Sequence, residues 1–209
     1  QTFPMTRLRV LEVGSFLGQS ALMWSEQITR HCTDGGSVLC IDPWKPFLSE
    51  GDVVNCGPLY QQTQRSLADG SAFEQFKKNI SQASVKAPIV FLRGTLSELF
   101  TFGGFSIEPF DIVYVDGSHY YSDVIQDLLL AKLLVRVGGV LCGDDLEIQF
   151  SQCNRSQCLE QAIAKKDFIG YHPGVTLAVW GMFGDVWSQA GAWAVQKTTD
   201  ATWRLPEGI

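Results

Sequence analysis

The sequence lacks both long hydrophobic runs and clusters of positive charge. Among its longest apolar stretches, Leu128 to Val135 is interrupted by a lysine and is far too short to cross a bilayer. The basic pairs are Lys77-Lys78 and Lys165-Lys166, and 22 acidic against 16 basic residues give a net charge of −6. These features argue against a membrane protein and against non-specific binding to nucleic acid.

Cysteine is too sparse for a disulfide-stabilised scaffold, with six residues in a chain of 209. Cys40 and Cys142 lie in apolar, strand-like runs, where a thiol behaves as a small hydrophobic group. Cys153 and Cys158 are four residues apart, but no second ligand pair follows at the spacing of a zinc site. We expect reduced thiols, and a disulfide between Cys153 and Cys158 stays open because their segment resembles a loop.

A chain of this length with 45% hydrophobic residues can bury an adequate core, so we expect one domain over residues 1–209. Its first residues, QTFPMTRLRVLEVG, contain no apolar segment typical of a signal peptide, which favours the cytoplasm. The stretch Pro43–Gly70 shows no clear periodicity and is rich in Gly, Pro, Gln and Ser. A segment of this kind is typical of an active-site lid or insertion.

Short apolar runs alternate with segments of helical periodicity, which predicts an α/β protein with a doubly wound, mostly parallel sheet. The expected strands are Arg7–Val13, Ser37–Ile41, Pro88–Leu92, Asp111–Val115 and Gly138–Cys142. The expected helices are Gln19–His31, Ala72–Ser84, Thr95–Phe100 and Ser122–Val135. Near the C-terminus, Val175–Phe183 and Trp193–Lys197 are expected to add an antiparallel hairpin, which completes a seven-stranded sheet.

Ligands of such sheets bind beyond the carboxyl ends of the strands. Gly14 and Gly18 bracket the turn after the first expected strand, where glycine permits a tight turn and the helix start offers free N–H groups. The spacing is not the dinucleotide fingerprint G-x-G-x-x-G. Asp42 follows the second strand, where a carboxylate can accept both hydroxyls of a ribose. Together they favour a nucleoside ligand, with an ordinary turn and a capping aspartate as the alternative.

Three carboxylates follow the fourth and fifth expected strands, namely Asp116, Asp144 and Asp145. Carboxylates placed close together raise one another's pKa unless a cation is present. Ligands that offer only oxygen suit a hard divalent ion, Mg²⁺ first and Ca²⁺ or Mn²⁺ next. The sequence therefore predicts a metal site, with helix capping and a solvated loop as the alternative.

These motifs resemble those of the class I S-adenosylmethionine-dependent methyltransferases. LEVGSFLGQSALMW resembles the first motif of that family, CIDPW the second, and RGTLSE the segment that lines the adenine. DIVYVDGSHYYSDVIQDLLLAKLLVRVGGVLCGDD resembles the metal-dependent O-methyltransferases, with the macrocin-type sugar O-methyltransferases nearest and the catechol O-methyltransferases as distant cousins. The resemblance covers about Leu8 to Asp145 and the C-terminal hairpin, and it implies a Rossmann-like methyltransferase fold.

The resemblance also implies roles for individual residues. S-adenosylmethionine would be held by Glu12, Gly14, Ser15, Gly18, Ser20, Asp42, Trp44, Thr95, Ser97 and Asp116. The divalent ion would be bound by Asp116, Asp144 and Asp145, so that Asp116 also has a catalytic part. His119 stands three positions after Asp116, where the catechol-type enzymes have a lysine as general base. A neutral imidazole can do the same work near neutral pH, and a plain hydrogen bond within the loop is the equal alternative.

The implied function is metal-assisted O-methylation of a small hydroxylated acceptor, such as a sugar, a catechol or a polyketide. The alternatives are an oxidoreductase that uses a nicotinamide dinucleotide and a non-catalytic cofactor-binding domain. The missing dinucleotide spacing counts against the first, and the intact Glu12 and Asp42 count against the second. Only a short segment precedes the first expected strand, whereas relatives carry N-terminal helices, so residues 43–70 are expected to complete the acceptor pocket. The acceptor is not specified, and a homodimer stays open.

Overall fold

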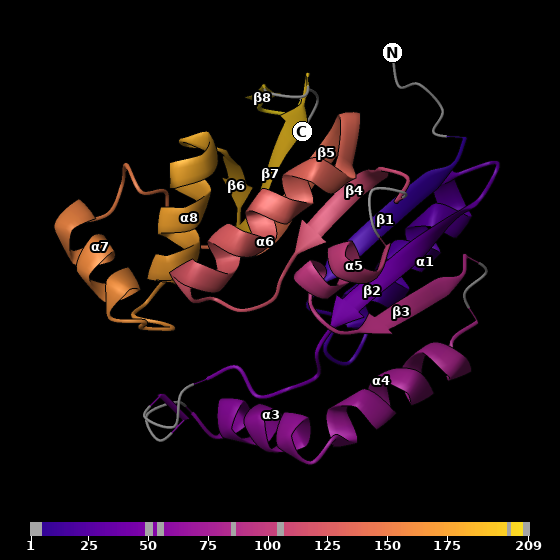
Figure 1. The fold of residues 1–209 in the computed structure, drawn as a ribbon, viewed down its shortest axis with the longest axis horizontal. Coiled ribbons are helices and arrows are strands. Elements are labelled where there is room, and N and C mark those ends of the chain that lie inside the picture. The colour runs from indigo at the N-terminus through magenta and orange to yellow at the C-terminus, as the bar shows by residue number, and fades with distance from the viewer. Residues whose placement is uncertain are drawn as a thin grey trace. The chain divides into compact units, whose positions relative to one another are not determined.

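The computed structural model describes residues 6–48, 52–53, 57–84, 87–103, 107–199 and 202–206. The chain divides into two compact units, residues 1–99 and residues 100–209 (Figure 1). Each unit alternates strands with helices, so the predicted α/β class with mostly parallel strands is confirmed. None of the helices in these ranges is long and apolar enough to cross a bilayer.

The first unit contains three parallel strands in the order β3-β2-β1. Its elements in chain order are β1 (Leu8–Val13), α1 (Gln19–His31), β2 (Gly36–Asp42), α3 (Pro58–Ala68), α4 (Ser71–Gln82), β3 (Ile89–Arg93) and the start of α5 (Leu96–Gly103). The register pairs Val13 with Ile41, and Asp42 with Arg93. The three strands therefore end at one edge of the sheet, where the turn before α1 also begins.

The second unit joins two parallel strands to an antiparallel extension. Its elements are β4 (Phe110–Val115), α6 (Tyr121–Leu134), β5 (Val135–Leu146), α7 (Arg155–Ile163), α8 (Pro173–Phe183), β6 (Trp187–Gln189), β7 (Gly191–Lys197) and β8 (Trp203–Arg204). β4 pairs with β5 in parallel, β5 pairs with β7 antiparallel, and β7 pairs antiparallel with both β6 and β8. An antiparallel hairpin at the C-terminal end is therefore present, but its first strand is β6 and not the predicted run.

The prediction of a strand over Val175–Phe183 is wrong, because this run forms most of α8. A continuous apolar run of nine residues fits a buried helix as well as a buried strand. Nearly all sides of α8 are buried, including Val175, Ala178 and Val179, so no helical period shows in its sequence. Pro173 in the first turn was the local sign of a helix start.

Two further helices were not predicted. The stretch Pro43–Gly70 contains α3, which begins at Pro58 and buries Gln64 and Leu67; residues 49–51 and 54–56 of that stretch lie outside the described residues. Helix α7 occupies a segment that resembled a loop, and the Asn154 side chain caps it by accepting a hydrogen bond from the Gln157 backbone N–H at 3.1 Å. A lid function for residues 43–70 stays a prediction.

The cysteines within the described ranges are free thiols, so the disulfide that stayed open between Cys153 and Cys158 is not formed. The Cys153 thiol donates to the Phe150 carbonyl at 3.4 Å, and the Cys158 thiol donates to the Pro173 carbonyl at 3.6 Å. Both side chains thus serve the packing around α7 and α8.

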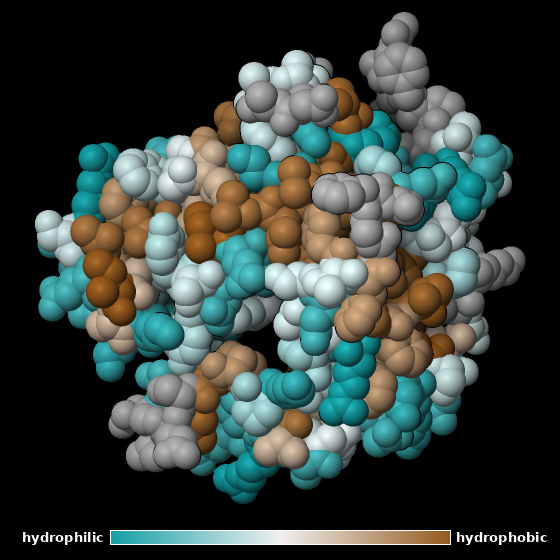
Figure 2. All heavy atoms as spheres, in the orientation of Figure 1, coloured by the Kyte–Doolittle hydropathy of each residue, from teal (hydrophilic) through white to brown (hydrophobic). Residues whose placement is uncertain are grey.

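Helix α6 presents an apolar strip to solvent, and Figure 2 shows hydrophobic side chains gathered over this helix. Leu129 and Leu133, one helical turn apart, are 54% and 66% exposed. The opposite side of α6 buries Val124, Leu128 and Ala131 against its own unit. The homodimer left open by the sequence stays a prediction.

Candidate functional site

The turn after β1 is organised around two buried carboxylates, Glu12 and Asp42. The Ser15 hydroxyl donates to Glu12 Oε2 at 2.6 Å. Asp42 accepts one backbone N–H on each oxygen, from Phe16 at 2.9 Å and from Trp44 at 2.5 Å. Burial raises the pKa of both Glu12 and Asp42. Glu12 and Asp42, which the sequence predicts to bind the cofactor and which are far apart in the chain, therefore both lie at this strand end.

Glycine is required at both ends of this turn. Gly14 has φ 88° and Gly18 has φ 83°, in the left-handed region that residues with a Cβ disfavour. A Cβ at Gly18 would also approach the Phe76 ring to 2.9 Å. The turn leads directly into α1, where Ser20 forms a side-chain hydrogen bond with Glu12. One Glu12 oxygen, Oε1, is buried and has no hydrogen-bond partner among the described residues.

Trp44 lies in an aromatic cluster of the first unit. Its ring centroid is 4.8 Å from that of Phe73 and 4.7 Å from that of Phe76, and the side chain is fully buried. Its indole N–H donates to the Phe16 carbonyl at 2.7 Å. Trp44 therefore supports the turn from within the core, and its contact with an adenine ring stays a prediction.

Thr95 and Ser97 lie where β3 passes into α5. The backbone N–H and the hydroxyl of Thr95 both donate to Glu98 Oε2, at 2.6 and 3.1 Å, and the Glu98 N–H donates back to the Thr95 hydroxyl at 3.2 Å. This reciprocal pair is a capping box. The Gly94 N–H donates to the Asp42 carbonyl at 3.0 Å, which ties this turn to the end of β2.

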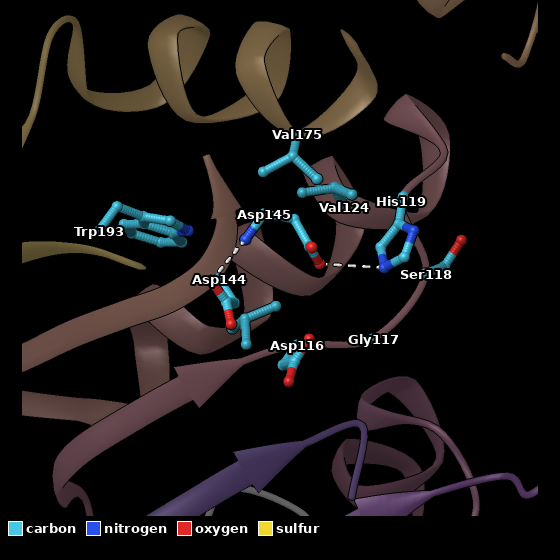
Figure 3. Close-up of a pocket in the computed structure, with 10 residues that line it drawn as sticks. Asp116, Gly117, Ser118, His119, Val124, Asp144, Asp145, Val175 and Trp193 are labelled. Atoms are coloured by element: carbon cyan, nitrogen blue, oxygen red, sulfur yellow. Dashed lines mark hydrogen bonds and ion pairs between the residues drawn. The ribbon is translucent and has the colours of Figure 1, made fainter. Parts of the chain in front are cut away.

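A second cluster lies at the carboxyl ends of β4 and β5 in the other unit, around a pocket (Figure 3). Asp116 follows β4, and Asp144 and Asp145 lie near the end of β5. The pairing of β5 with β7 is irregular between Gly143 and Leu146, and Asp145 has φ 65°. Irregularities of this kind change the direction in which a side chain points from the strand. Figure 3 shows the Asp145 carboxylate directed at His119.

The three aspartates that the sequence predicts as metal ligands are thus gathered in one unit. Burial, together with the charges of Asp145 and Asp144, raises the pKa of Asp116 to about 7, although the charge of His119 and the hydrogen bond from Tyr114 act to lower it. Burial also raises the pKa of Asp144. The Tyr114 hydroxyl donates to Asp116 Oδ2 at 3.2 Å. Burial and neighbouring negative charge therefore disfavour the ionised forms of Asp116 and Asp144.

His119 lies between two carboxylates. Its Nε2 is 3.0 Å from Asp145 Oδ2, and its Nδ1 is 2.8 Å from Asp167 Oδ1. Burial lowers the pKa of His119, but the hydrogen bonds to Asp145 and Asp167 outweigh burial and raise it to about 10. Burial alone would raise the pKa of Asp145, and the bond to His119 lowers it instead. A role for His119 as base requires that this imidazolium first lose its proton, and it stays a prediction.

Sequence reasoning missed three neighbours of this cluster. His172, which the sequence did not assign to this cluster, has Nδ1 2.8 Å from Glu147 Oε1 and 3.5 Å from Asp145 Oδ1. The His172 and His119 rings are 4.3 Å apart between centroids. Neither Glu147 nor Asp167 belongs to a motif. The one sequence signal was His172 itself, directly before the proline that starts α8.

Close packing of α8 on the His119 loop holds the two histidines together. A Cβ at Gly174 would lie 2.2 Å from the His119 carbonyl oxygen and 2.6 Å from the Tyr121 nitrogen. We expect Gly174→Ala to lower the free energy of unfolding by about 1–3 kcal/mol, because the backbone must shift to admit the methyl group. Gly181→Ala on the same helix is the control, since a Cβ there meets nothing within 4 Å.

The control should gain up to about 1 kcal/mol from helix propensity. Urea unfolding of both variants measures the difference. Equal stability of the two variants would contradict the close approach of α8 to the His119 loop.

The sequence profile of a family described as "Methyltransferase domain" matches residues 11–146, from β1 to the end of β5. No curated protein matches the chain.

Solved structures of methyltransferases are similar to this chain to different degrees. The calicheamicin methyltransferase CalS11 is 13% identical, covers 90% of this chain and 72% of its own, and has a TM-score of 0.54. The S-adenosylmethionine-dependent methyltransferase SibL is 15% identical over 92% of this chain and 51% of its own, with a TM-score of 0.50. The O-methyltransferase TomG from Streptomyces achromogenes is 18% identical over 90% and 73%, with a TM-score of 0.43. The chain spans from 44% to 73% of the length of such structures.

Proposed function

The chain belongs to the family of methyltransferase domains, and we propose that it transfers the methyl group of S-adenosylmethionine to a hydroxyl oxygen of a small molecule. The observation that carries this proposal is the turn after β1, which two glycines bracket and where Glu12 Oε1 is buried without a hydrogen-bond partner among the described residues. CalS11 and SibL, which share the fold, are methyltransferases by description, and SibL uses S-adenosylmethionine.

The residues of the turn fit the parts of this cofactor. Glu12 Oε1 is an unsatisfied acceptor, and the cofactor's ammonium group is a donor of opposite charge that would satisfy it. Each Asp42 oxygen accepts one backbone N–H and retains a lone pair for a ribose hydroxyl. We propose that the methionine part of the cofactor contacts the backbone at Gly14, Ser15 and Gly18. The further contacts that we propose come from Ser20, Thr95 and Ser97.

We propose that a divalent cation, Mg²⁺ in the first place, binds at Asp116, Asp144 and Asp145. Carboxylate oxygens suit a hard ion. Such an ion would stabilise the ionised form of Asp116, whose pKa is raised. When bound, a divalent ion lowers the pKa of a coordinated hydroxyl and orients it. We propose that His119 takes up the hydroxyl proton while the oxygen attacks the methyl carbon, the C–S bond breaks, and S-adenosylhomocysteine leaves.

Asp42→Ala tests the cofactor site. We expect this variant to bind S-adenosylhomocysteine about 10–100-fold more weakly, because charge-assisted hydrogen bonds to two hydroxyls contribute about 1.5–3 kcal/mol. Titration calorimetry measures the affinity, and Asp34→Ala in the exposed turn before β2 is the control with the same loss of charge. Equal affinities of Asp42→Ala and Asp34→Ala would move the ribose away from β2 and count against the proposed cofactor site.

A further inference from the structure

A cluster of two imidazoles and one carboxylate is not fully used by the proposed reaction. His119, Asp145 and His172 each offer one donor atom, and these atoms all lie within 4.8 Å of one another. The three residues come from the loop after β4, the end of β5 and the residue before α8. Donors about 2.1 Å from a shared ion lie up to about 4.2 Å apart, so movements of less than an ångström would bring all three onto one ion.

Each histidine of this cluster has a second carboxylate on its Nδ1. Asp167 lies 2.8 Å from Nδ1 of His119, and Glu147 lies 2.8 Å from Nδ1 of His172. Metal-binding histidines commonly hold one ring nitrogen on a carboxylate in this way, which fixes the tautomer and leaves the other nitrogen for the metal. Asp167 therefore has the position of an outer partner of a metal site, and Glu147 lies beside the His172 nitrogen that is nearest Asp145.

The two histidines reach the shared carboxylate through different ring nitrogens, because His172 brings Nδ1 to 3.5 Å from Asp145 Oδ1. His119 Nε2 faces Asp145, the shared carboxylate (Figure 3). His172 is 3% exposed, and its Nε2 is buried with no hydrogen-bond partner within the described part of the chain. A buried imidazole nitrogen without a protein partner is a suitable ligand for a metal ion.

We propose that His119, Asp145 and His172 form a binding site for a transition-metal ion of the zinc class. Imidazole nitrogen selects zinc-like ions over Mg²⁺, which prefers oxygen, so this site differs in selectivity from the all-aspartate site with which it shares Asp145. Binding of the ion does not depend on methyl transfer. One consequence rests on the proposed function. The proposed base takes up a proton at His119 Nε2, and an ion bound to that nitrogen blocks this step. We therefore expect Zn²⁺ to inhibit methyl transfer.

The test is a Zn²⁺ titration of the metal-free full chain, in competition with a chromophoric chelator and in excess Mg²⁺. We expect one Zn²⁺ per chain in the wild type, and at least tenfold weaker binding in His119→Gln and His172→Gln. His31→Gln removes the third histidine of the chain, which is exposed on α1, and Cys153→Ser removes a partly buried thiol. Both controls should bind as the wild type does.

Asp167→Asn is a further site variant that leaves all three proposed ligands in place. It tests the inference even if His172→Gln does not fold. We expect it to bind Zn²⁺ about 10–100-fold more weakly, because the outer partner orients His119. Three results would overturn the inference: no stoichiometric Zn²⁺ in the wild type, unchanged affinity in all three site variants, or loss of binding in Cys153→Ser. Failure of methyl transfer in Mg²⁺ alone would count against the proposed function and leave the Zn²⁺ result unaffected.

Discussion

Chelation of divalent ions should abolish methyl transfer while leaving the affinity for S-adenosylhomocysteine unchanged. The proposed cofactor residues from Glu12 to Ser97 are held by hydrogen bonds within their own unit, so they do not need the ion. The proposed ion contributes instead at Asp116, Asp144 and Asp145, where it lowers the pKa of the acceptor hydroxyl. Without it, a neutral hydroxyl is a poor nucleophile, and the three carboxylates repel one another.

Added Mg²⁺ or Mn²⁺ should restore activity in the wild type, and Asp144→Ala should blunt this restoration. The Asp144 side chain is the best of the three to remove, because Asp145 also holds His119 and Asp116 accepts from Tyr114. Initial rates against metal concentration, with calorimetry of the cofactor in parallel, measure the effect. Full activity in excess chelator would remove the metal from the mechanism and leave His119 to take up the proton alone.

Replacement of His119 by alanine should lower turnover by about a hundredfold or more, while cofactor affinity stays as in the wild type. The imidazole is the proposed proton acceptor for the hydroxyl. Asp167→Asn is the matched variant, because it keeps the imidazole and removes the carboxylate on its Nδ1.

We expect Asp167→Asn to lose much less turnover than His119→Ala in metal-free buffer with Mg²⁺ added. Single-turnover rates separate the chemical step from cofactor binding. Near-normal rates in His119→Ala across pH 6–9 would reduce His119 to a structural partner of Asp145 and Asp167.

The helices and strands whose hydrophobic pattern in the sequence matches their burial in the structure were predictable from the sequence. Helix α1 has the predicted bounds Gln19–His31, and the first five predicted strands appear as β1 to β5. Since the strand ends follow from these runs, the sequence also placed Gly14, Asp42 and the three aspartates at strand ends. Helix α8 was missed because burial on nearly all sides removes the periodic signal on which such predictions rest.

The surroundings of His119 could not be predicted, because they are set by tertiary packing. Asp167 and His172 are 48 and 53 residues further along the chain, and no motif connects them to the loop after β4. They reach His119 because Gly174 allows α8 to pack directly on that loop. Likewise, nothing local to Trp44 distinguishes a stacking surface from the core position that the structure gives it.

The central claim is that the turn after β1 binds S-adenosylmethionine, and calorimetric titration of the full chain with S-adenosylhomocysteine and with NAD tests it most directly. The account predicts one S-adenosylhomocysteine per chain, with binding weakened in Asp42→Ala and no heat from NAD. Binding of NAD with no binding of S-adenosylhomocysteine would contradict it.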